Sequence, residues 1–233
     1  MKVLAIVPAR SGSKGFADKN IKKIKNKTLL ELAIKVAVDC PLVNDIYVST
    51  DSNHYLEIAT KAGGKSFGLR DSSLSTDDAK TVDVVIDVLQ KCKTSYDYVV
   101  LLQPTSPLRS PNDIEMMISL IQKNNADASV SISPHDEPHP YKLKSISTNG
   151  MISSFINGKN SEIPRQILPK AYALTGSIYI TKANVILKNK TLLPKKTIPY
   201  IMKDNINIDN EKDFIYLNIM RKLKKVKIWG VDK

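Results

Sequence analysis

Short apolar runs that alternate with helical patterns restrict this chain, more than any other feature, to a layered α/β fold. Residues 3–7, 46–49 and 98–102 are apolar runs of the kind that is buried on both faces of a parallel sheet. A helical pattern follows each run after a polar loop, which is the order that places helices against such a sheet. We therefore expect a Rossmann-like, mixed but mainly parallel sheet flanked by helices, in one domain over residues 1–233.

Local signals indicate where these elements begin and end. Thr28 and Glu31 have the spacing of a capping box, Gly63 and Gly64 suit the end of a helix, and Pro111 suits a first helical turn. The expected helices begin near residues 28, 50, 78 and 111 and after residue 209. The expected strands cover residues 3–7, 46–49, 65–67, 98–102, 128–132, 172–180 and 197–202.

The loop after the first strand combines glycines with cations. Gly12 and Gly15 permit a positive φ and a close backbone approach, while Arg10, Lys14 and Lys19 supply positive charge. Such a loop suits a polyanion such as a nucleoside triphosphate, because fixed cations stabilise the charge that moves onto the leaving pyrophosphate. A basic surface turn is the alternative. The Walker A and dinucleotide-binding patterns are both absent from the sequence.

The composition excludes several classes of function. The formal net charge is +12, but the lysines are spread along the whole chain and the aromatic residues form no stacking array, so we expect no nucleic-acid partner. Cys40 and Cys92 lack metal-type spacing and are expected to be reduced thiols. No apolar run approaches the length of a membrane span, and the first residues lack a leader pattern. These features predict a cytoplasmic protein that does not bind membranes.

Arginine is rare in this lysine-rich chain. Only five of the 35 basic residues are arginine, at positions 10, 70, 109, 165 and 221. Arginine is expected where a planar, bidentate contact to phosphate or carboxylate cannot be replaced by a point charge. All but the last of these arginines fall in segments that other signals assign to the site.

The first loop resembles the signature of the acylneuraminate cytidylyltransferases, I-P-A-R-x-G-S-K-G-x-x-x-K-N. The turn at residues 103–109 also resembles that family, matching Q-P-T-S-P-x-R at every fixed position. The sugar-1-phosphate and Kdo branches of related enzymes carry G-G-x-G-T-R or R-L-P-G-K in the first loop, and neither is present. The matching positions of the first loop are Pro8, Ala9, Arg10, Gly12, Ser13, Lys14, Gly15, Lys19 and Asn20.

Two further segments resemble the family with one departure each. Residues 70–77 are similar to R-P-x-x-L-x-x-D, with Asp71 in place of the proline. The run at 172–180 is similar to a segment with N-G-x-x-Y, with Gly176 and Tyr179 retained and Thr175 in place of the asparagine. These matches cover nearly the whole chain in the expected order.

The resemblance implies a nucleotidyltransferase fold and a metal-dependent transfer of CMP from CTP to a sialic acid, with release of pyrophosphate, for surface glycan synthesis. It implies catalytic roles for Arg10, Lys14, Lys19 and Asp209. The implied nucleotide-binding residues are Ala9, Arg10, Ser11, Gly12, Lys19, Asn20, Arg70 and Thr81. The implied sugar-binding residues are Gln103, Thr105, Ser106, Arg109, Thr175, Tyr179 and the Arg165 of a second subunit.

Residues 133–172 interrupt the regular alternation of strands and helices. By resemblance this segment is an inserted arm that exchanges with a second subunit and carries Arg165 into its site, which implies a homodimer. The group of acidic and imidazole side chains here could suggest a metal cluster, but neighbouring prolines favour an extended loop. That group consists of His135, Asp136, Glu137 and His139.

The expected metal site departs from the family pattern. Related enzymes carry Asp-x-Asp where this chain has Asn207-Ile208-Asp209. We expect Asp209 and Asn207 to hold Mg²⁺ (or Mn²⁺), with one negative charge fewer than in the relatives. Asp213 is expected to serve the first turn of the last helix instead. The basic run at 221–225 is expected to be a solvated face.

Two alternatives remain open at the level of sequence. The acceptor could be legionaminic acid or another bacterial nonulosonic acid, since Thr175 departs from the family in a sugar-facing segment. The chain could also be a regulatory protein that binds CTP without turnover. No general base is evident in the sequence, so a metal-bound hydroxide, or a metal that lowers the pKa of the sugar hydroxyl, is a hypothesis.

Overall fold

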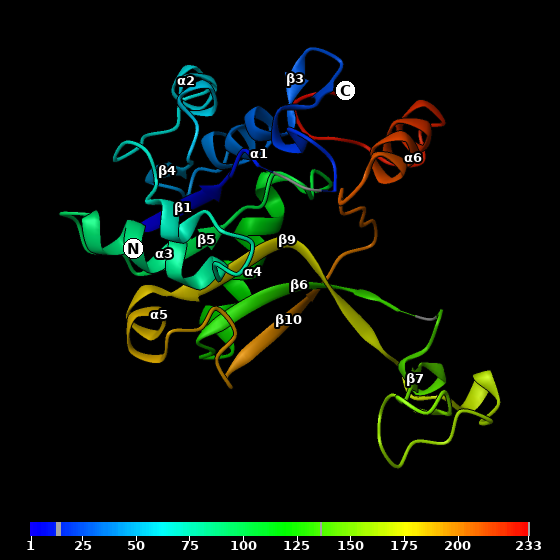
Figure 1. The fold of residues 1–233 in the computed structure, drawn as a ribbon. Helices are drawn as coiled ribbons and strands as arrows, with labels where there is room; N and C mark the ends of the chain where they lie inside the picture. The colour runs from blue at the N-terminus through cyan, green and yellow to red at the C-terminus, as the bar shows by residue number, and fades with distance from the viewer. Residues whose placement is uncertain (13–14, 136, 233) are drawn as a thin grey trace.

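The computed structural model describes residues 1–12, 15–135 and 137–232 and centres on a six-stranded sheet (Figure 1). The strand order is β10-β6-β9-β5-β1-β4. Strand β9 runs antiparallel to both of its neighbours, and the remaining pairs are parallel, which confirms the expected mixed, mainly parallel sheet. The strands are β1 (Val3–Pro8), β4 (Asp45–Ser49), β5 (Tyr98–Leu101), β6 (Ala128–Pro134), β9 (Tyr172–Lys182) and β10 (Thr197–Ile201).

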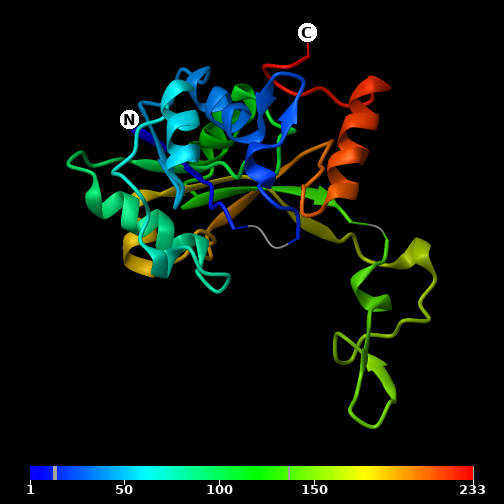
Figure 2. The ribbon, with the colours of Figure 1, turned by 45° about the horizontal axis from the view of Figure 1, so that its top comes forward.

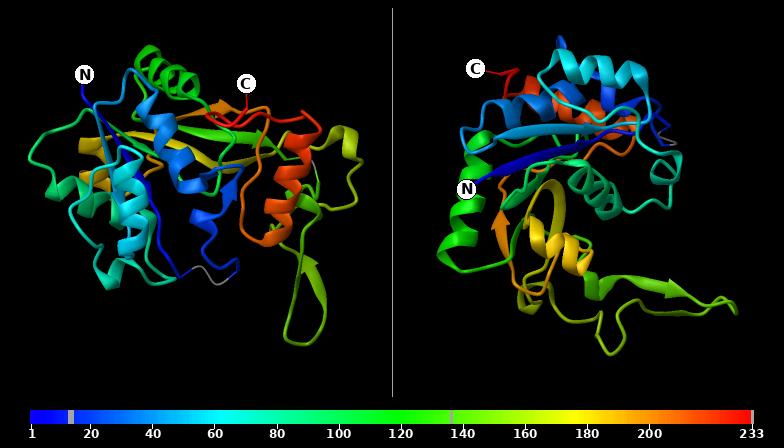
Figure 3. Two further views of the ribbon diagram at one scale, coloured as in Figure 1. Left: turned by 90° about the horizontal axis from the view of Figure 1, so that it is seen from above. Right: turned by 90° about the vertical axis from the view of Figure 1, so that its left-hand side faces the viewer.

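Helices cover both faces of this sheet (Figure 3). α1, α2 and α4 contribute to one apolar cluster, α3 and α5 to a cluster on the opposite face, and α6 packs with the C-terminal segment in a third. The helices are α1 (Leu29–Val38), α2 (Asn53–Lys61), α3 (Thr81–Lys91), α4 (Pro111–Lys123), α5 (Ala183–Asn189) and α6 (Glu211–Lys222). Short 3-10 turns are Lys19–Ile21, Ser72–Leu74, Pro140–Lys142 and Arg165–Ile167, and the short strands β2 (Lys23–Ile24) and β3 (Lys27–Thr28) form a small hairpin.

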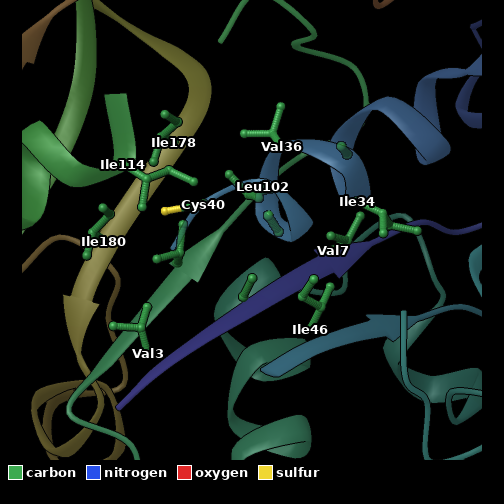
Figure 4. Close-up of a cluster of buried hydrophobic side chains, with 14 of the residues drawn as sticks. Val3, Val7, Ile34, Val36, Cys40, Ile46, Leu102, Ile114, Ile178 and Ile180 are labelled. Carbon is green, nitrogen blue, oxygen red and sulfur yellow. The ribbon is translucent and has the colours of Figure 1, made fainter. Parts of the chain in front are cut away.

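Strand β1 shows why the first apolar run has no polar alternation. Val3 and Val7 point into the cluster with α1, α2 and α4, whereas Leu4 and Ile6 point into the cluster with α3 and α5. All four side chains are fully buried, since successive residues of a strand face opposite sides of a sheet that is covered twice. Figure 4 shows the first cluster, in which Val7 of β1 lies near Ile34 of α1 and Val3 lies toward the other end of the strand.

The parallel register brings the loops of the predicted site to one edge of the sheet. β1 pairs in parallel with both β4 and β5, so their carboxyl ends point the same way. Residues 9–20, 50–52 and 102–109 follow these ends. In open α/β sheets this edge is where ligands bind.

Several predicted boundaries are confirmed. Thr28 and Glu31 form the expected capping box at α1. Asp213 serves the first turn of α6, accepting the backbone N–H groups of Asp209 and Asn210. Such carboxylates satisfy helix-end donors and favour the helix dipole.

Three local predictions are wrong. The strand expected at 65–67 is reduced to a single bridge between Tyr47 and Lys65. The chain then turns away from the sheet, and the ring of Phe67 stacks on that of Tyr47 with 4.4 Å between the ring centroids. The helix expected from residue 78 begins at Thr81, and α5 was not expected. The short length of α5 explains why periodicity missed it.

The C-terminal basic run is exposed at residues 222–225, as expected, but not at Arg221. The Arg221 side chain is largely buried, and its Nη1 lies 3.1 Å from Asp232 Oδ1. Val226 and Ile228 are buried in the third cluster, so the chain folds back after α6 and covers α1. The run at 221–225 is therefore anchored at both ends, which its composition does not reveal.

The segment at residues 133–172 projects from the body of the molecule (Figure 2). β6 and β9 form its base, pairing as far as Pro134 and Tyr172, and the hairpin of β7 (Lys144–Ile146) and β8 (Ile152–Ser154) lies further out. It carries exposed apolar side chains, namely Ile146, Met151, Ile152, Phe155 and Ile167. Among the helices of the described residues, none is long and apolar enough to cross a membrane.

Candidate active site

A cavity of about 390 Å³ lies at the carboxyl edge of the sheet. Its walls come from the loop after β1, the segment at 70–84, the turn after β5 and the segment before α6. Elements from both ends of the chain therefore meet at one pocket. The predicted site residues that line it are Arg10, Lys19, Asn20, Arg70, Thr81, Gln103, Thr105, Asn207 and Asp209.

Backbone contacts fasten the first loop to the end of β4. The Ala9 N–H donates to the Ser49 carbonyl at 2.9 Å, and the Ser11 N–H donates to Asp51 Oδ1 at 2.8 Å. Asn20 is buried, and its Nδ2 donates to the Arg10 carbonyl at 2.9 Å. The loop is thus held close to the pocket by hydrogen bonds in which its cationic side chains take no part.

The left-handed residue of this loop, within the described part, is Asp18 rather than a glycine. Asp18 has φ 52, whereas Gly12 shows no positive φ. The hydroxyl of the buried Tyr55 donates to Asp18 Oδ1 at 2.9 Å, and burial together with this contact raises the pKa of Tyr55. Sequence reasoning missed both Asp18 and Tyr55. Asp18 could have been suspected, because aspartate in a loop tolerates the left-handed conformation. Lys14 lies outside the described residues.

Two cations of the loop form ion pairs across the pocket. Arg10 Nη2 lies 2.6 Å from Asp77 Oδ1, and Lys19 Nζ lies 3.1 Å from Asp209 Oδ1. Both cations line the pocket, and neither pair is fully buried. A triphosphate could bind Arg10 and Lys19 beside these carboxylates or in their place. An ammonium or guanidinium group can donate hydrogen bonds to several oxygens at once.

Arg70 presents an unsatisfied donor at the pocket. Its Nε donates to Ser75 Oγ at 3.1 Å, its backbone N–H donates to the Thr50 carbonyl, and its buried Nη2 has no partner. Burial lowers the pKa of Arg70, an effect that nearby Asp51 opposes. Buried polar groups are nearly always hydrogen-bonded, so Nη2 is suited to an acceptor supplied by a ligand.

The turn after β5 is joined to the segment before α6. The Ile208 N–H donates to the Thr105 carbonyl at 2.8 Å, and Ser106 Oγ donates to Asn207 Oδ1 at 2.9 Å. Gly176 lies beneath them with φ +72, and a Cβ there would lie 3.0 Å from Gln103 Oε1. Glycine is required at this position both by the backbone conformation and by the close approach.

Tyr179 and Thr175 lie on β9 but in different surroundings. Tyr179 lines a neighbouring hollow of about 210 Å³ that shares Thr81 and Gln103 with the main pocket. Burial raises the pKa of Tyr179. Thr175 is 2% exposed, and its hydroxyl lies 2.6 Å from Ser131 Oγ inside the protein. The structure therefore places the Thr175 side chain below the pocket rather than on its wall.

Arg109 is also buried away from the main pocket. Its Nη1 donates to the Ser177 carbonyl, while Nε and Nη2 have no protein partner. Burial lowers the pKa of Arg109 to about 9, which Asp113 partly opposes. The structure brings Arg109 together with β9 and the start of α4, whereas Gln103 and Thr105 of the same turn line the main pocket.

Arg165 lies on the projecting segment, apart from the pocket of its own chain. It forms an ion pair with Glu137, and together with Lys142 and His139 it lines a separate hollow of about 460 Å³. Sequence reasoning did not single out Lys142, and nothing distinguishes it from the other lysines of the chain. The two cations Lys142 and Arg165 thus face one hollow at the base of the arm.

The described residues form no preformed metal-binding cluster. Within residues 1–12, 15–135 and 137–232, no group of three or more His, Cys, Asp or Glu side chains could hold a metal ion. His139 instead contacts the Pro169 carbonyl at 2.9 Å, and a turn at 137–138 and the 3-10 turn Pro140–Lys142 stand where an extended loop was expected. Asp136 lies outside the described residues. At the main pocket, two carboxylates contact the loop after β1, Asp77 through Arg10 and Asp209 through Lys19.

A mainly parallel sheet with a cation-lined pocket at its carboxyl edge is typical of α/β proteins that bind an anionic ligand at that edge. The chain belongs to the cytidylyltransferase family, whose profile matches residues 4–218. It is therefore a nucleotidyltransferase, as the two sequence motifs predicted, and the alternative of a regulatory protein without turnover is set aside.

Similar proteins agree with this assignment. The chain is 34% identical over 220 residues to a CMP-N,N'-diacetyllegionaminic acid synthase of Legionella pneumophila, covering 92% of this chain and 94% of that one. It is 34% identical over 221 residues to an N-acylneuraminate cytidylyltransferase of Streptococcus agalactiae, covering 93% of this chain and 52% of that one. The chain therefore spans about half the length of the streptococcal relatives that it matches.

A solved structure shows the same fold. The structure of CMP:2-keto-3-deoxy-manno-octonic acid synthetase complexed with CTP aligns with a TM-score of 0.70 at 18% identity, covering 96% of this chain and 100% of that chain. At this level of identity the likeness establishes the architecture of the sheet and its helices.

Proposed function

We propose that this chain is a CMP-nonulosonate synthase, which transfers CMP from CTP to a nine-carbon sialic-type acid and releases pyrophosphate. The observation that carries the proposal is the pocket itself. The cations Arg10 and Lys19 line it together with Arg70, Gln103 and Asp209. The names of the similar proteins support the same class of product, whether legionaminic or sialic.

The nucleotide occupies the side of the pocket formed by the first loop and residues 70–84. Arg10, Lys14 and Lys19 bind the triphosphate, with Ala9, Ser11 and Gly12 shaping the loop by their backbone. Asn20 fixes the Arg10 carbonyl, and the free Nη2 of Arg70 suits an acceptor on the nucleotide. Thr81 lies at the start of α3, where the main pocket meets the neighbouring hollow.

The acceptor occupies the side formed by the turn after β5 and the neighbouring hollow. Gln103 and Thr105 line the main pocket, and Tyr179 lines the hollow together with Leu101 and Leu192. A polar edge beside an apolar wall suits a sugar acid that carries both hydroxyl and acyl groups. Because Thr175 is buried, its departure from the family pattern gives no reason to exclude sialic acid, and legionaminic acid remains the second candidate acceptor.

The reaction forms one bond and breaks one. The oxygen of the anomeric 2-hydroxyl attacks the α-phosphorus of CTP, the bond to the bridging oxygen of pyrophosphate breaks, and the hydroxyl proton passes to water. The protein's contribution is positioning and charge stabilisation, in which Lys19 and Arg10 neutralise the leaving pyrophosphate.

Asp209 is the residue that would hold a divalent cation such as Mg²⁺ (or Mn²⁺). Its side chain is 67% exposed and faces the phosphate loop, and one carboxylate plus phosphate oxygens is a usual ligand set for Mg²⁺. When bound, the cation would supply charge neutralisation at the phosphates and a lowered pKa for the sugar hydroxyl. With nucleotide and cation bound, Lys19 would contact the phosphates as well as Asp209, its partner in the structure.

The arm is proposed to bind a second copy of the chain. Its exposed apolar residues are too many for a surface that remains in water, and the hollow with Lys142 and Arg165 presents two cations. In a homodimer these cations would reach the carboxylate of the acceptor bound to the partner, completing a site that one chain forms only in part. A cytoplasmic location, where CTP is made, fits this reaction.

A pyrophosphate-release assay tests the proposal. We expect release with CTP plus a nonulosonic acid and far less with ATP or GTP. The acceptor panel contains sialic, legionaminic, pseudaminic and 2-keto-3-deoxy-manno-octonic acids, so that the acceptor is identified in the same experiment. Equal turnover with all nucleotides, or release with none of the acids, would reject the proposed function.

A further inference from the structure

The side-chain amide of Asn207 lies between a buried hydroxyl and an exposed carboxylate. Asn207 Nδ2 donates to Asp209 Oδ2 at 2.7 Å, and Ser106 Oγ donates to Asn207 Oδ1 at 2.9 Å. Ser106 is fully buried. The amide thus connects the turn after β5 to the carboxylate that faces the phosphate loop.

The chemistry of these partners determines the orientation of the amide. An ionised carboxylate only accepts hydrogen bonds, so the amide atom 2.7 Å from Asp209 Oδ2 must be the NH₂ group. The amide oxygen then points to Ser106. Only that oxygen could bind a hard cation such as Mg²⁺, and it is turned away from Asp209.

Asp209 is held through both of its oxygens. Lys19 Nζ lies 3.1 Å from Oδ1, and Asn207 donates to Oδ2. Its negative charge is balanced by the ammonium, and no second carboxylate stands at position 207. Without nucleotide this arrangement attracts a divalent cation weakly, whereas a bound triphosphate would engage Lys19 and add its own oxygen ligands.

We propose, on the basis of the proposed function, that Asn207 is a positioning residue that orients Asp209 and does not bind the cation itself. The cation then enters with the nucleotide instead of occupying a site formed in advance. The isosteric change Asn207→Asp replaces the donor by a second carboxylate and should create a site that fills without nucleotide.

Mn²⁺ binding, measured from the paramagnetic resonance signal of the free ion, tests this. Wild type and Asn207→Ala should bind Mn²⁺ equally weakly without nucleotide. With CTP, both should bind more Mn²⁺ than the same concentration of CTP binds without protein, with affinities within about threefold of each other. Asn207→Asp should bind Mn²⁺ without CTP more tightly than wild type by about tenfold or more. Asn53→Ala, at the exposed start of α2, is the control and should match wild type.

Steady-state kinetics give a second, independent reading. Loss of the hydrogen bond to the charged Asp209 in Asn207→Ala should lower kcat by about tenfold, while the KM for CTP stays within about threefold of wild type. This split separates a positioning role from a merely structural one, which would lower the folded fraction and leave the kcat of the folded enzyme unchanged.

Saturable Mn²⁺ binding to nucleotide-free wild type that Asn207→Ala abolishes would overturn the proposal, because it would make Asn207 a ligand. An Asn207→Ala enzyme with unchanged kcat would also overturn it. Failure of the proposed function looks different: no acid would support pyrophosphate release in any variant, while the Mn²⁺ measurements, which need only metal and CTP, would still decide the role of Asn207.

Discussion

Lys19 Nζ lies 3.1 Å from Asp209 Oδ1 although 190 positions of the chain separate the two residues. The contact joins the phosphate loop to the segment before α6. It is reinforced by a close backbone approach, since a Cβ on Gly15 would lie 3.1 Å from the Asp209 carbonyl oxygen. The pocket therefore forms only when the two ends of the chain pack together.

Lys19→Ala should impair turnover without unfolding the protein. Loss of one charge-assisted phosphate contact costs about 1.5 to 3 kcal/mol, which corresponds to a fall in kcat/KM of roughly tenfold to slightly over a hundredfold. Pyrophosphate release and thermal unfolding would measure this. Lys91→Ala, which removes an exposed helix lysine paired with Asp87, is the matched control. Unchanged kinetics of the Lys19 variant would remove Lys19 from the site.

Asp209→Ala should abolish turnover at every Mg²⁺ concentration, because it removes the carboxylate proposed to hold the cation against the phosphates. Asp204→Ala, in the same segment but outside the main pocket, serves as the control. A metal titration of both variants makes the comparison. An active Asp209→Ala enzyme would place the metal site elsewhere.

Tyr55→Phe should loosen the phosphate loop. The change removes only the hydroxyl that donates to Asp18, and the exposed Asp18 can bond water instead, so we expect the free energy of unfolding to fall by about 1 kcal/mol. The KM for CTP should rise by about threefold as Lys19 becomes less well positioned. Tyr216→Phe, on the exposed face of α6, should change neither value. A Tyr55 variant with wild-type KM would limit its role to stability.

Gly176→Ala should affect the acceptor more than the nucleotide. The left-handed backbone alone costs about 1 to 2 kcal/mol, and the new Cβ would also displace the Gln103 side chain, 3.0 Å away. Gly150→Ala has the same backbone strain, with φ +79, but nothing lies within 4 Å. Gly176→Ala should therefore lose at least as much stability as Gly150→Ala, and only Gly176→Ala should raise the KM for the acid. Equal KM values for the acid in the two variants would show that displacing the Gln103 side chain does not affect acceptor binding.

Mixing two variants that each impair a different part of the site tests the exchanged arm. If Arg165 acts in the partner's site, Arg165→Ala chains combined with Lys19→Ala chains should recover up to about a quarter of wild-type activity, which is the statistical yield of intact sites in a randomly mixed two-fold dimer. Activity should also fall on dilution. Lack of recovery despite confirmed subunit exchange would place Arg165 in its own chain's site or outside any site.

The parts of the site that follow directly from a strand end were predictable from the sequence. Arg10 and Lys19 follow β1, and Gln103 and Thr105 follow β5, so the parallel register alone brings them to one edge. The α1 boundary was equally predictable, because the Thr28–Glu31 capping box is local. Where an element depends on distant packing, as at 65–67 or at Arg221, sequence reasoning failed.

Burial separated residues that the sequence motifs treat alike. Within one turn, Gln103 and Thr105 line the pocket while Arg109 is enclosed beside Ser177. Thr175 likewise lies under the pocket. A motif records which residues occur together, but the direction of each side chain depends on the strands and helices that pack around it.

The sequence by itself determined the class of fold and placed the cationic loop after β1 and the polar turn after β5 at strand ends, because these depend on local conformation and on the order of apolar runs. Only the tertiary structure decided which charges meet: that Lys19 pairs with Asp209, that Tyr55 holds Asp18, and that Asn207 turns its oxygen toward Ser106. The physical reason is that such contacts join positions far apart in the chain, and their geometry is fixed by packing of the core rather than by any residue's neighbours in sequence.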